Sequence, residues 1–438
     1  MKILIRDGHV VDPSQGIDGI EDVVIEDGKI HEVQKRKNEG SKGEKGRRGG
    51  NSELGYRIID ASGMFVFPGL IDMHVHLREP GFEYKETIET GTLAAIKGGI
   101  TSVCCMPNTN PVNDNSSISE FIIKKAVEEG SCSVYPIGAI TKGQRGEELA
   151  EFAMMSEAGC VAFSDDGRPV MDSLMMRRAL EYSKVLKALI ISHCEDLSLS
   201  AGGVMNEGLR SFTLGLKGVP VQAEQIMVAR DIALAELTGG RLHIAHISTA
   251  DSVALLSAAK KRGLAEITAE TCPHYFTITE EAVEGYNTNA KVNPPLRTLK
   301  DIDAIKEGLR DGTIDVIATD HAPHHSDEKL GEFNLAPSGI SGLETSLCLC
   351  MKLVAEGVLS LKELIEKMAV NPARITGINK GTLKVGSEAD LVIVDPRKEY
   401  RVDSTEFLSK GKNTPFDGWV LKGRPLVTIV KGRIYTWD

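Results

Sequence analysis

From Arg57 onward, short apolar runs alternate with longer amphipathic stretches, and this alternation constrains the possible fold more than any other feature of the chain. Near-continuous apolar runs are typical of parallel strands buried on both faces, and the amphipathic stretches between them fit covering helices. Eight such runs end in polar residues, at His74–His76, Met106–Thr109, Gly138–Thr141, Ser164–Gly167, His193–Asp196, His246–Thr249, Pro273–Tyr275 and Thr319–His321. The pattern predicts an α/β protein with a closed (β/α)8 TIM barrel, whose functional residues gather at the carboxyl ends of the strands.

The two ends of the chain follow a different pattern of short alternating strands. Asp7-Gly8 and Asp27-Gly28 are hairpin signals in the first segment. Strand patterns resume after residue 377, and Val427–Tyr435 resembles Val23–Ile30. We therefore expect residues 1–65 and 377–438 to pair into one small β-sandwich beside a catalytic barrel formed by residues 66–376.

One segment of the amino-terminal part, residues 35–54, is charged, glycine-rich and nearly free of apolar side chains. Such a segment cannot offset its ordering entropy by burial, so we expect a mobile insertion. Its basic character could also serve as a tether for phosphate or RNA, but a solvated loop is the simpler interpretation.

Net charge and the distribution of apolar residues limit the kinds of molecule that the protein is expected to bind. The formal net charge is -11 and the pI is about 5.6, whereas a nucleic-acid footprint normally needs a clustered excess of lysine and arginine. No apolar run reaches the roughly 18 residues of a membrane span, and the first residues do not resemble a secretory signal. We predict a cytoplasmic enzyme with a small-molecule substrate, no nucleic acid and no membrane, and eight cysteines that are buried thiols.

Histidines and aspartates at the strand ends predict a metal centre. His74 and His76 are two residues apart, so their side chains leave a strand in the same direction. The other candidates at strand ends are His193, His246, Asp320 and one aspartate of the pair Asp165-Asp166. Imidazoles and carboxylates are ligands that suit zinc. Because four histidines and two carboxylates exceed the needs of one catalytic zinc, we expect two metal ions about 3.5 to 4 Å apart.

Several motifs together resemble the cyclic amidohydrolases, and within them the type I dihydroorotase family. The motifs are His74–Arg78, Met106–Thr109, Phe163–Gly167, His193–Asp196, Val292–Arg297 and Ala318–His324. The resemblance covers nearly the whole chain except residues 35–54. It implies that His74, His76 and Asp320 hold one zinc ion and that His193 and His246 hold the other.

The resemblance also implies a bridging aspartate, for which we expect Asp166, with Asp165 as the alternative. Other amidohydrolases place a carboxylated lysine at this strand end, but Val161–Asp166 contains no lysine. This departure separates the chain from the hydantoinase and allantoinase pattern.

The implied reaction is the reversible cyclisation of N-carbamoyl-L-aspartate to dihydroorotate with loss of water, a step of pyrimidine synthesis. In the hydrolytic direction, Asp320 would accept a proton from the attacking water and transfer it to the leaving ring nitrogen. A homo-oligomer, or an association with aspartate transcarbamoylase, is compatible with the same resemblance.

The substrate carries a carboxylate, so the pocket needs donors of fixed geometry. Arg78 can form two parallel hydrogen bonds to a carboxylate, and Asn108 and His324 could complete this carboxylate clamp. Further substrate contacts are expected from His76, from Asn293, and from the backbone of Ser338 and Gly339.

Two other histidines have weaker predictions. His243 has the opposite strand parity to His246 and is expected to face the core, whereas His321 is expected to orient a metal ligand. Two alternatives to a dihydroorotase are a cyclic amidase for hydantoin or allantoin, and a silent barrel that serves as a scaffold for another enzyme. The missing lysine argues against the first, and the complete ligand set argues against the second.

Overall fold

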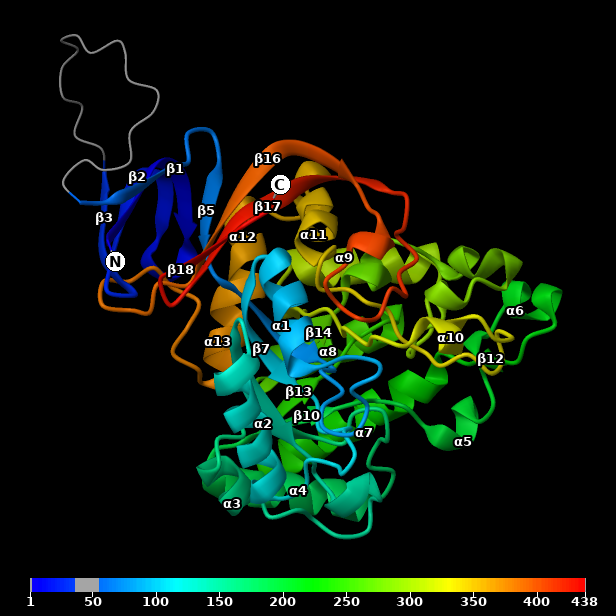
Figure 1. Ribbon diagram of the computed structural model, residues 1–438. Helices are drawn as coiled ribbons and strands as arrows, with labels where there is room; N and C mark the ends of the chain where they lie inside the picture. Colours follow the sequence, from blue (N-terminus) through cyan, green and yellow to red (C-terminus); the bar gives the residue numbers. More distant parts are fainter. Residues whose placement is uncertain (1, 36–54, 438) are drawn as a thin grey trace.

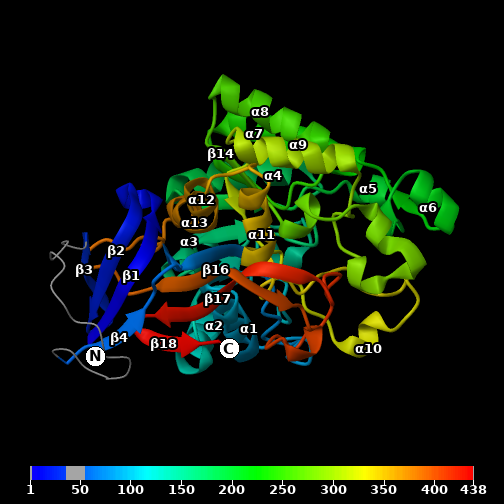
Figure 2. The same ribbon diagram turned by 90° about the horizontal axis from the view of Figure 1, so that it is seen from above.

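A computed structural model describes residues 2–35 and 55–437 (Figure 1). The predicted mobile insertion therefore lies outside the described residues, apart from Lys35 at the end of a strand. Within the described part, a barrel with surrounding helices lies beside a mixed sheet that contains strands from both ends of the chain (Figure 2).

The barrel consists of eight parallel strands in sequence order, which confirms the predicted (β/α)8 fold. The strands are β6 (Leu70–Val75), β7 (Ile100–Cys105), β8 (Ser133–Gly138), β9 (Ala162–Ser164), β10 (Leu189–Ser192), β13 (Arg241–Ile244), β14 (Ile267–Thr271) and β15 (Val316–Ile317). The first and last strands meet at the end of β6, where its last residue, Val75, forms a parallel bridge with His321 and His76 N donates to His321 O at 2.8 Å. The barrel therefore closes at the rim that carries the candidate ligands.

Helices cover the outside of the barrel. They are α1 (Ile88–Lys97), α2 (Ser116–Glu129), α3 (Phe152–Glu157), α4 (Ser173–Leu186), α7 (Gln222–Thr238), α8 (Ala250–Arg262), α9 (Leu299–Arg310), α11 (Ser346–Ala355), α12 (Leu361–Ile365) and α13 (Asn371–Thr376). Local sequence sets their ends. The side chains of Asn115, Asp172 and Thr249 cap α2, α4 and α8, and a left-handed glycine, Gly263, ends α8.

The loops at the carboxyl ends of the strands contain the remaining short elements. A small excursion after β10 holds α5 (Leu197–Ser200), β11 (Met205–Asn206), α6 (Leu209–Leu214) and β12 (Gly218–Val219). The loop after β15 holds α10 (Ser326–Lys329). These segments lie on the side of the barrel where the site is expected (Figure 1).

Both chain ends share one sheet with the strand order β18-β17-β16-β5-β1-β2-β3, and β4 pairs with β1. The strands are β1 (Lys2–Asp12), β2 (Ile17–Glu26), β3 (Lys29–Lys35), β4 (Arg57–Asp60), β5 (Phe65–Pro68), β16 (Leu391–Arg401), β17 (Val420–Val430) and β18 (Arg433–Thr436). The ends join where β5 pairs antiparallel with β16. The expected pairing of the two ends is confirmed. The domain boundaries at 65 and 377 remain a proposal.

One hairpin prediction is wrong. Asp27-Gly28 does form the turn between β2 and β3, but Asp7-Gly8 lies inside β1 at a register shift. Asp7 has a φ of 58°, a conformation that a β-bulge and a hairpin turn both use, so the dipeptide alone does not distinguish them. A Cβ on Gly8 would lie 2.5 Å from Val66, which explains the glycine at this close approach.

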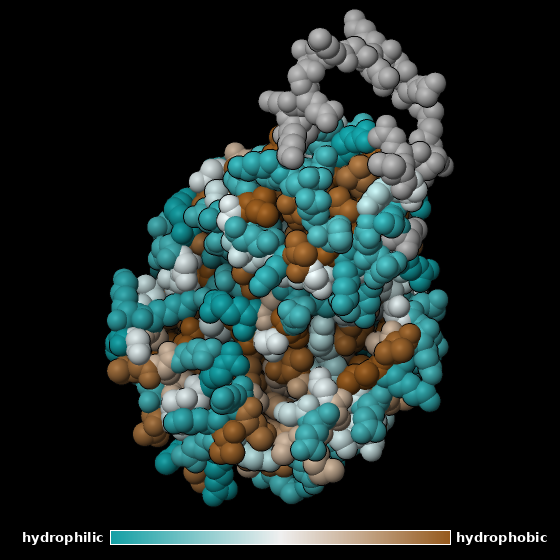
Figure 3. Space-filling model, turned by 90° about the vertical axis from the view of Figure 1, so that its left-hand side faces the viewer, coloured by the Kyte–Doolittle hydropathy of each residue, from teal (hydrophilic) through white to brown (hydrophobic). Residues whose placement is uncertain are grey.

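Other expectations concern burial and surface. All eight cysteines are buried and free, as predicted. Among the described residues, no helix combines the length and apolar character that a membrane crossing requires. On the face shown in Figure 3, hydrophobic residues are scattered among hydrophilic ones.

Candidate active site

The six predicted metal ligands meet at the carboxyl-terminal rim of the barrel. His74 and His76 come from β6 and the residue after it, and the others follow β9, β10, β13 and β15 by one to three residues. All six side chains are buried: His74, His76, Asp166, His193, His246 and Asp320 are each at most 5% exposed. We call these six residues the metal-ligand cluster.

Asp166 lies at the centre of the cluster. Its Oδ1 lies 3.5 Å from His74 Nε2, 3.3 Å from His193 Nδ1 and 3.5 Å from His246 Nε2. Its Oδ2 lies 3.5 Å from His76 Nε2. The geometry of Asp166 is therefore that expected of a residue shared by two groups of ligands.

Asp320 closes the other side of the cluster. Its Oδ1 lies 3.0 Å from His76 Nε2 and 3.4 Å from His74 Nε2. The ligand atoms of His74, His76 and Asp320 all lie within 4.8 Å of one another, as do those of His74, Asp166 and His246. Two overlapping groups of potential ligands are therefore present.

Outer partners orient three of the imidazoles. His74 Nδ1 lies 2.6 Å from Glu270, His76 Nδ1 lies 2.9 Å from Asn108 Oδ1, and His193 Nε2 lies 3.0 Å from Glu195. If each of these nitrogens donates to its oxygen partner, the other ring nitrogen presents a lone pair to the cluster. This is the usual arrangement of metal-binding histidines.

The donor atoms fit a metal ion. Within the described residues, His74 Nε2 and Asp166 Oδ1 are buried without a hydrogen-bond partner. Buried polar atoms of this kind are rare, because an unpaired group loses the hydrogen bonds it made with water. His193 Nδ1 and His246 Nε2 approach to 2.7 Å, a hydrogen-bond distance that requires a proton on one of the two nitrogens. A divalent cation would satisfy all of these atoms.

The electrostatics of the cluster favour a positive charge. Burial lowers the pKa of His74, but Asp166, Asp320 and Glu270 outweigh this effect and hold the pKa well above its ordinary value. Burial raises the pKa of Asp166, but His74 and His193 outweigh it and hold the pKa well below its usual range. The carboxylates are thus ionised and attract a cation into the site.

The predicted substrate residues line the cavity beside the cluster. The cavity has a volume of about 320 Å³. His76, Arg78, Asn108, Asn293, His324, Ser338 and Gly339 all contribute to its wall, together with Asp166, His193, His246 and Asp320. The structure therefore brings every predicted site residue to one place, since the fully buried His74 lies within 3.5 Å of Asp166 and Asp320 of this wall.

Two cations flank His324. Lys85 Nζ lies 3.3 Å from Nδ1, and Arg78 Nη2 lies 3.4 Å from Nε2. Burial lowers the pKa of His324 to about 2, and Arg78 and Lys85 add to the effect. Because Lys85 donates to Nδ1, we assign the proton to Nε2, which donates to Ser338 O at 2.9 Å. His324 is therefore neutral, with its one N–H held by Ser338 O, and the positive groups of Arg78 and Lys85 beside it suit an anionic ligand.

Two neighbouring residues have other roles. Asp165, the alternative bridging residue, accepts from Ile140 N and Thr141 N and faces away from the cluster. His243 lies 2.8 Å from Thr268 Oγ1 and 3.2 Å from Glu270, in the core as expected.

The prediction that His321 orients a metal ligand is wrong. Its Nε2 lies 3.3 Å from Glu86, and its Nδ1 accepts from Gly342 N. His321 follows Asp320 directly in the sequence, but its ring contacts Glu86 and Gly342 instead of the cluster.

Two functional residues were not predicted from the sequence. Glu270 contacts both His74 and His243, and Glu195 contacts His193 and accepts from Asn293 Nδ2 at 2.9 Å. A charged residue inside the strand Ile267–Thr271 was a signal for Glu270, because buried acids need partners.

Solved structures with the same fold include an L-hydantoinase (dihydropyrimidinase) from Arthrobacter aurescens. It is 27% identical in sequence, with a TM-score of 0.86 over 99% of this chain and 96% of the other. The fold and the ligand-rich rim together define a metal-dependent cyclic amidohydrolase.

More similar sequences identify the family within this class. A family model described as dihydro-orotase-like matches residues 63–252. Dihydroorotases from Syntrophus aciditrophicus and Geobacter metallireducens are 54% and 56% identical over 434 residues, covering 99% of this chain and 99% of each relative. The chain belongs to the dihydroorotase family.

Proposed function

We propose that the protein catalyses the reversible cyclisation of N-carbamoyl-L-aspartate to dihydroorotate plus water, in pyrimidine synthesis. The observation that carries this proposal is that the metal-ligand cluster and the carboxylate clamp line the same cavity. A cyclic amide bound by its carboxylate at Arg78 and His324 would place its ring toward Asp320. No lysine replaces Asp166 at the end of β9, which supports a dihydroorotase over a hydantoinase or an allantoinase.

The cofactor of this proposal is Zn²⁺, with two ions per chain. His74, His76 and Asp320 would hold one, His193 and His246 the other, and Asp166 would bridge them. A bound metal lowers the pKa of water to about 7 and polarises a carbonyl oxygen.

The residues of the chain then perform the proton transfer and the positioning. Burial raises the pKa of Asp320, but His74 and His76 outweigh it and lower the pKa below its usual value. Asp320 is therefore an ionised base that can accept a proton from water and return it to the ring nitrogen of the leaving amide. In the cyclising direction the same carboxyl group takes the proton from the attacking nitrogen.

The carboxylate clamp fixes the orientation of the substrate. Arg78 donates its Nε to Pro323 O at 3.2 Å, which leaves its terminal nitrogens for the ligand. Asn293 is held by Glu195 and offers its amide oxygen to the ring. His76 and the backbone of Ser338 and Gly339 would complete the contacts to the substrate.

Three further predictions rest on the sequence and the resemblance alone. They are the cytoplasmic location, a homo-oligomer, and an association with aspartate transcarbamoylase. Size-exclusion chromatography of the purified protein, alone and mixed with that enzyme, tests the last two.

The direct test combines a metal count with an assay. The purified protein should contain close to two zinc ions per chain, and dihydroorotate should disappear in an ultraviolet absorbance assay. Chelation should abolish turnover and added zinc should restore it. Turnover of hydantoin or allantoin in place of dihydroorotate would favour the cyclic amidase alternative, and a metal-free, inactive protein would favour a scaffold.

A further inference from the structure

A loop from the mixed sheet reaches the active-site rim. Residues 402–419 connect β16 to β17, and we call this connection the 402–419 loop. Its apolar residues Val402, Phe407 and Phe416 pack in a cluster with Leu349 of α11. A Cβ on Gly411 would lie 2.4 Å from Cβ of Pro323, so the loop lies directly on the segment that follows β15.

Asn413 of this loop contacts both backbone segments that carry predicted substrate contacts. Its Nδ2 donates to Ala322 O at 3.1 Å and to Gly339 O at 2.9 Å. Its Oδ1 accepts from His324 N at 3.0 Å and from Ser341 Oγ at 3.0 Å. The side chain is 3% exposed, and these contacts use both donor hydrogens and both lone pairs of the amide.

The backbone of Asn413 adds a further contact, because Ser341 N donates to Asn413 O at 2.8 Å. Gly339 has a φ of 148°, and a Cβ there would lie 2.5 Å from Ala322 O. The two segments therefore lie in close contact, and a parallel bridge between His321 and Ile340 joins them, with Ala322 N donating to Ile340 O at 2.9 Å. Beside this bridge and the contact of His324 Nε2 with Ser338 O, the buried amide of Asn413 connects the two segments at the wall of the cavity.

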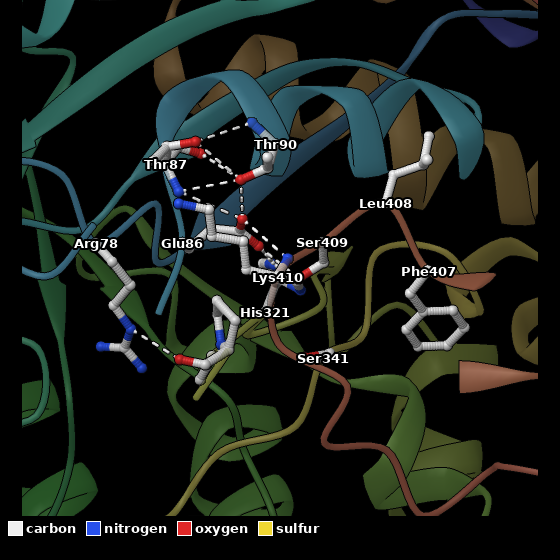
Figure 4. Close-up of polar contacts among 12 residues, drawn as sticks. Arg78, Glu86, Thr87, Thr90, His321, Ser341, Phe407, Leu408, Ser409 and Lys410 are labelled. Carbon is white, nitrogen blue, oxygen red and sulfur yellow. Dashed lines mark hydrogen bonds and ion pairs between the residues drawn. The ribbon is translucent and has the colours of Figure 1, made fainter. Parts of the chain in front are cut away.

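A second contact fixes the loop to the barrel. Ser409 Oγ donates to Glu86 Oε2 at 2.5 Å, and Lys410 N donates to Glu86 Oε1 at 3.2 Å. Figure 4 shows Ser409 and His321 approaching the Glu86 carboxylate from different segments. Glu86 is fully buried, and it lies in the segment that follows Arg78. The loop thus contacts the chain on both sides of the carboxylate clamp.

We propose that Asn413 is a positioning residue that sets the spacing between His324 and the Ser338–Gly339 backbone, and thereby the affinity for the substrate carboxylate. Asn413 touches none of the metal ligands through any of the contacts above. Loss of its amide should therefore weaken substrate binding more than the chemical step. This inference rests on the proposed function.

The test compares two variants with a matched control. Asn413→Asp keeps the shape but replaces the donor group with an oxygen that faces two carbonyl oxygens, and Asn413→Ala removes the bridge with less repulsion. Asn371→Asp is the control, because Asn371 Nδ2 donates to Asp315 O at 2.9 Å, at the amino end of β15 and away from the site. The zinc-loaded, full-length protein is used in each case.

We expect KM for dihydroorotate to rise about tenfold or more in both Asn413 variants, with kcat within about threefold of the wild type and bound zinc unchanged. Asn371→Asp should leave KM unchanged even where it lowers the melting temperature. If Asn413→Asp does not fold, the Asn413→Ala result decides.

Two results would overturn the inference. One is a KM within about twofold of the wild type in a folded Asn413 variant. The other is a loss of kcat and zinc with no change in KM, which would assign Asn413 to the metal-ligand cluster. A zinc-loaded wild type that does not turn over dihydroorotate would instead overturn the proposed function, and this inference with it.

Discussion

The metal-ligand cluster and the carboxylate clamp line one cavity, yet the chain builds them in different ways. The cluster residues stand at or just after strand ends, where the closed barrel fixes the backbone. His324 stands seven residues after β15 and Arg78 three residues after β6, and other segments hold these loops through side-chain contacts such as that of Asn413 with His324. A barrel thus fixes its strand ends directly, whereas the outer part of its site depends on contacts between loops.

The largest effect on turnover should come from substituting Asp320, the proposed proton-transfer residue. Asp320→Asn should lower kcat by about 10³-fold or more, because an amide cannot accept the proton of water. The protein should remain folded by circular dichroism, and its zinc content should be measured alongside the rate. Near-normal turnover would remove Asp320 from the proton transfer.

Asp165 and Asp166 are adjacent in the sequence. Substituting each in turn tests whether metal binding requires a carboxylate that faces the histidines. Asp166→Asn should lose bound zinc and most turnover, since Asp166 alone of the pair faces the histidines. Asp165→Asn should keep its bound zinc and its turnover. Its free energy of unfolding should fall by about 1 to 2 kcal/mol, because the hydrogen bonds from Ile140 and Thr141 are weakened. Metal analysis and chemical denaturation measure the two outcomes. Equal zinc loss in both variants would contradict the geometry.

A substitution in the carboxylate clamp should change KM and leave the zinc content as it is, unlike a substitution in the metal-ligand cluster. Arg78→Ala should raise KM for dihydroorotate by about 10- to 100-fold, because a hydrogen bond to a charged group contributes about 1.5 to 3 kcal/mol. Zinc content should not change. Steady-state kinetics should measure KM for both Arg78→Ala and Arg78→Lys, since lysine keeps the positive charge. An unchanged KM in Arg78→Ala would exclude the arginine from the clamp.

The smallest effect is the contribution of His324 to the pH dependence of the free energy of unfolding. The pKa of His324 is lowered to about 2 in the folded protein by burial and by the cations Arg78 and Lys85, whereas an unfolded histidine titrates near 6.5. Below pH 6.5 the unfolded state therefore binds the extra proton, and stability is lost as the pH falls. Between pH 6.5 and 5 this loss amounts to about 2 kcal/mol for one fully shifted histidine.

His324→Gln should remove this part of the acid destabilisation. Urea unfolding at pH 7 and pH 5 should show a smaller difference in the variant than in the wild type. His325→Gln, a substitution of the exposed neighbour, is the control. An identical difference in all three proteins would contradict the assignment of a neutral His324.

The difference between the two regions also explains which predictions succeeded. The alternation of apolar runs and amphipathic stretches predicted the barrel, and strand parity predicted that His74 and His76 would point the same way. The pairing of the chain ends was predicted from hairpin patterns, although Asp7-Gly8 proved to be a bulge. The orientation of His321 was not predicted correctly, because its partner Glu86 is 235 residues away in the sequence.

The sequence by itself determined the elements, their order and the ligand-capable residues at their ends, because periodicity and strand parity are local properties of the chain. Only the tertiary structure decided that Asp166 and not Asp165 meets the histidines, that Glu270 and Glu195 orient them, and that Asn413 from the mixed sheet joins the rim. Each of these depends on which distant segments come into contact, and closure of the barrel sets those contacts.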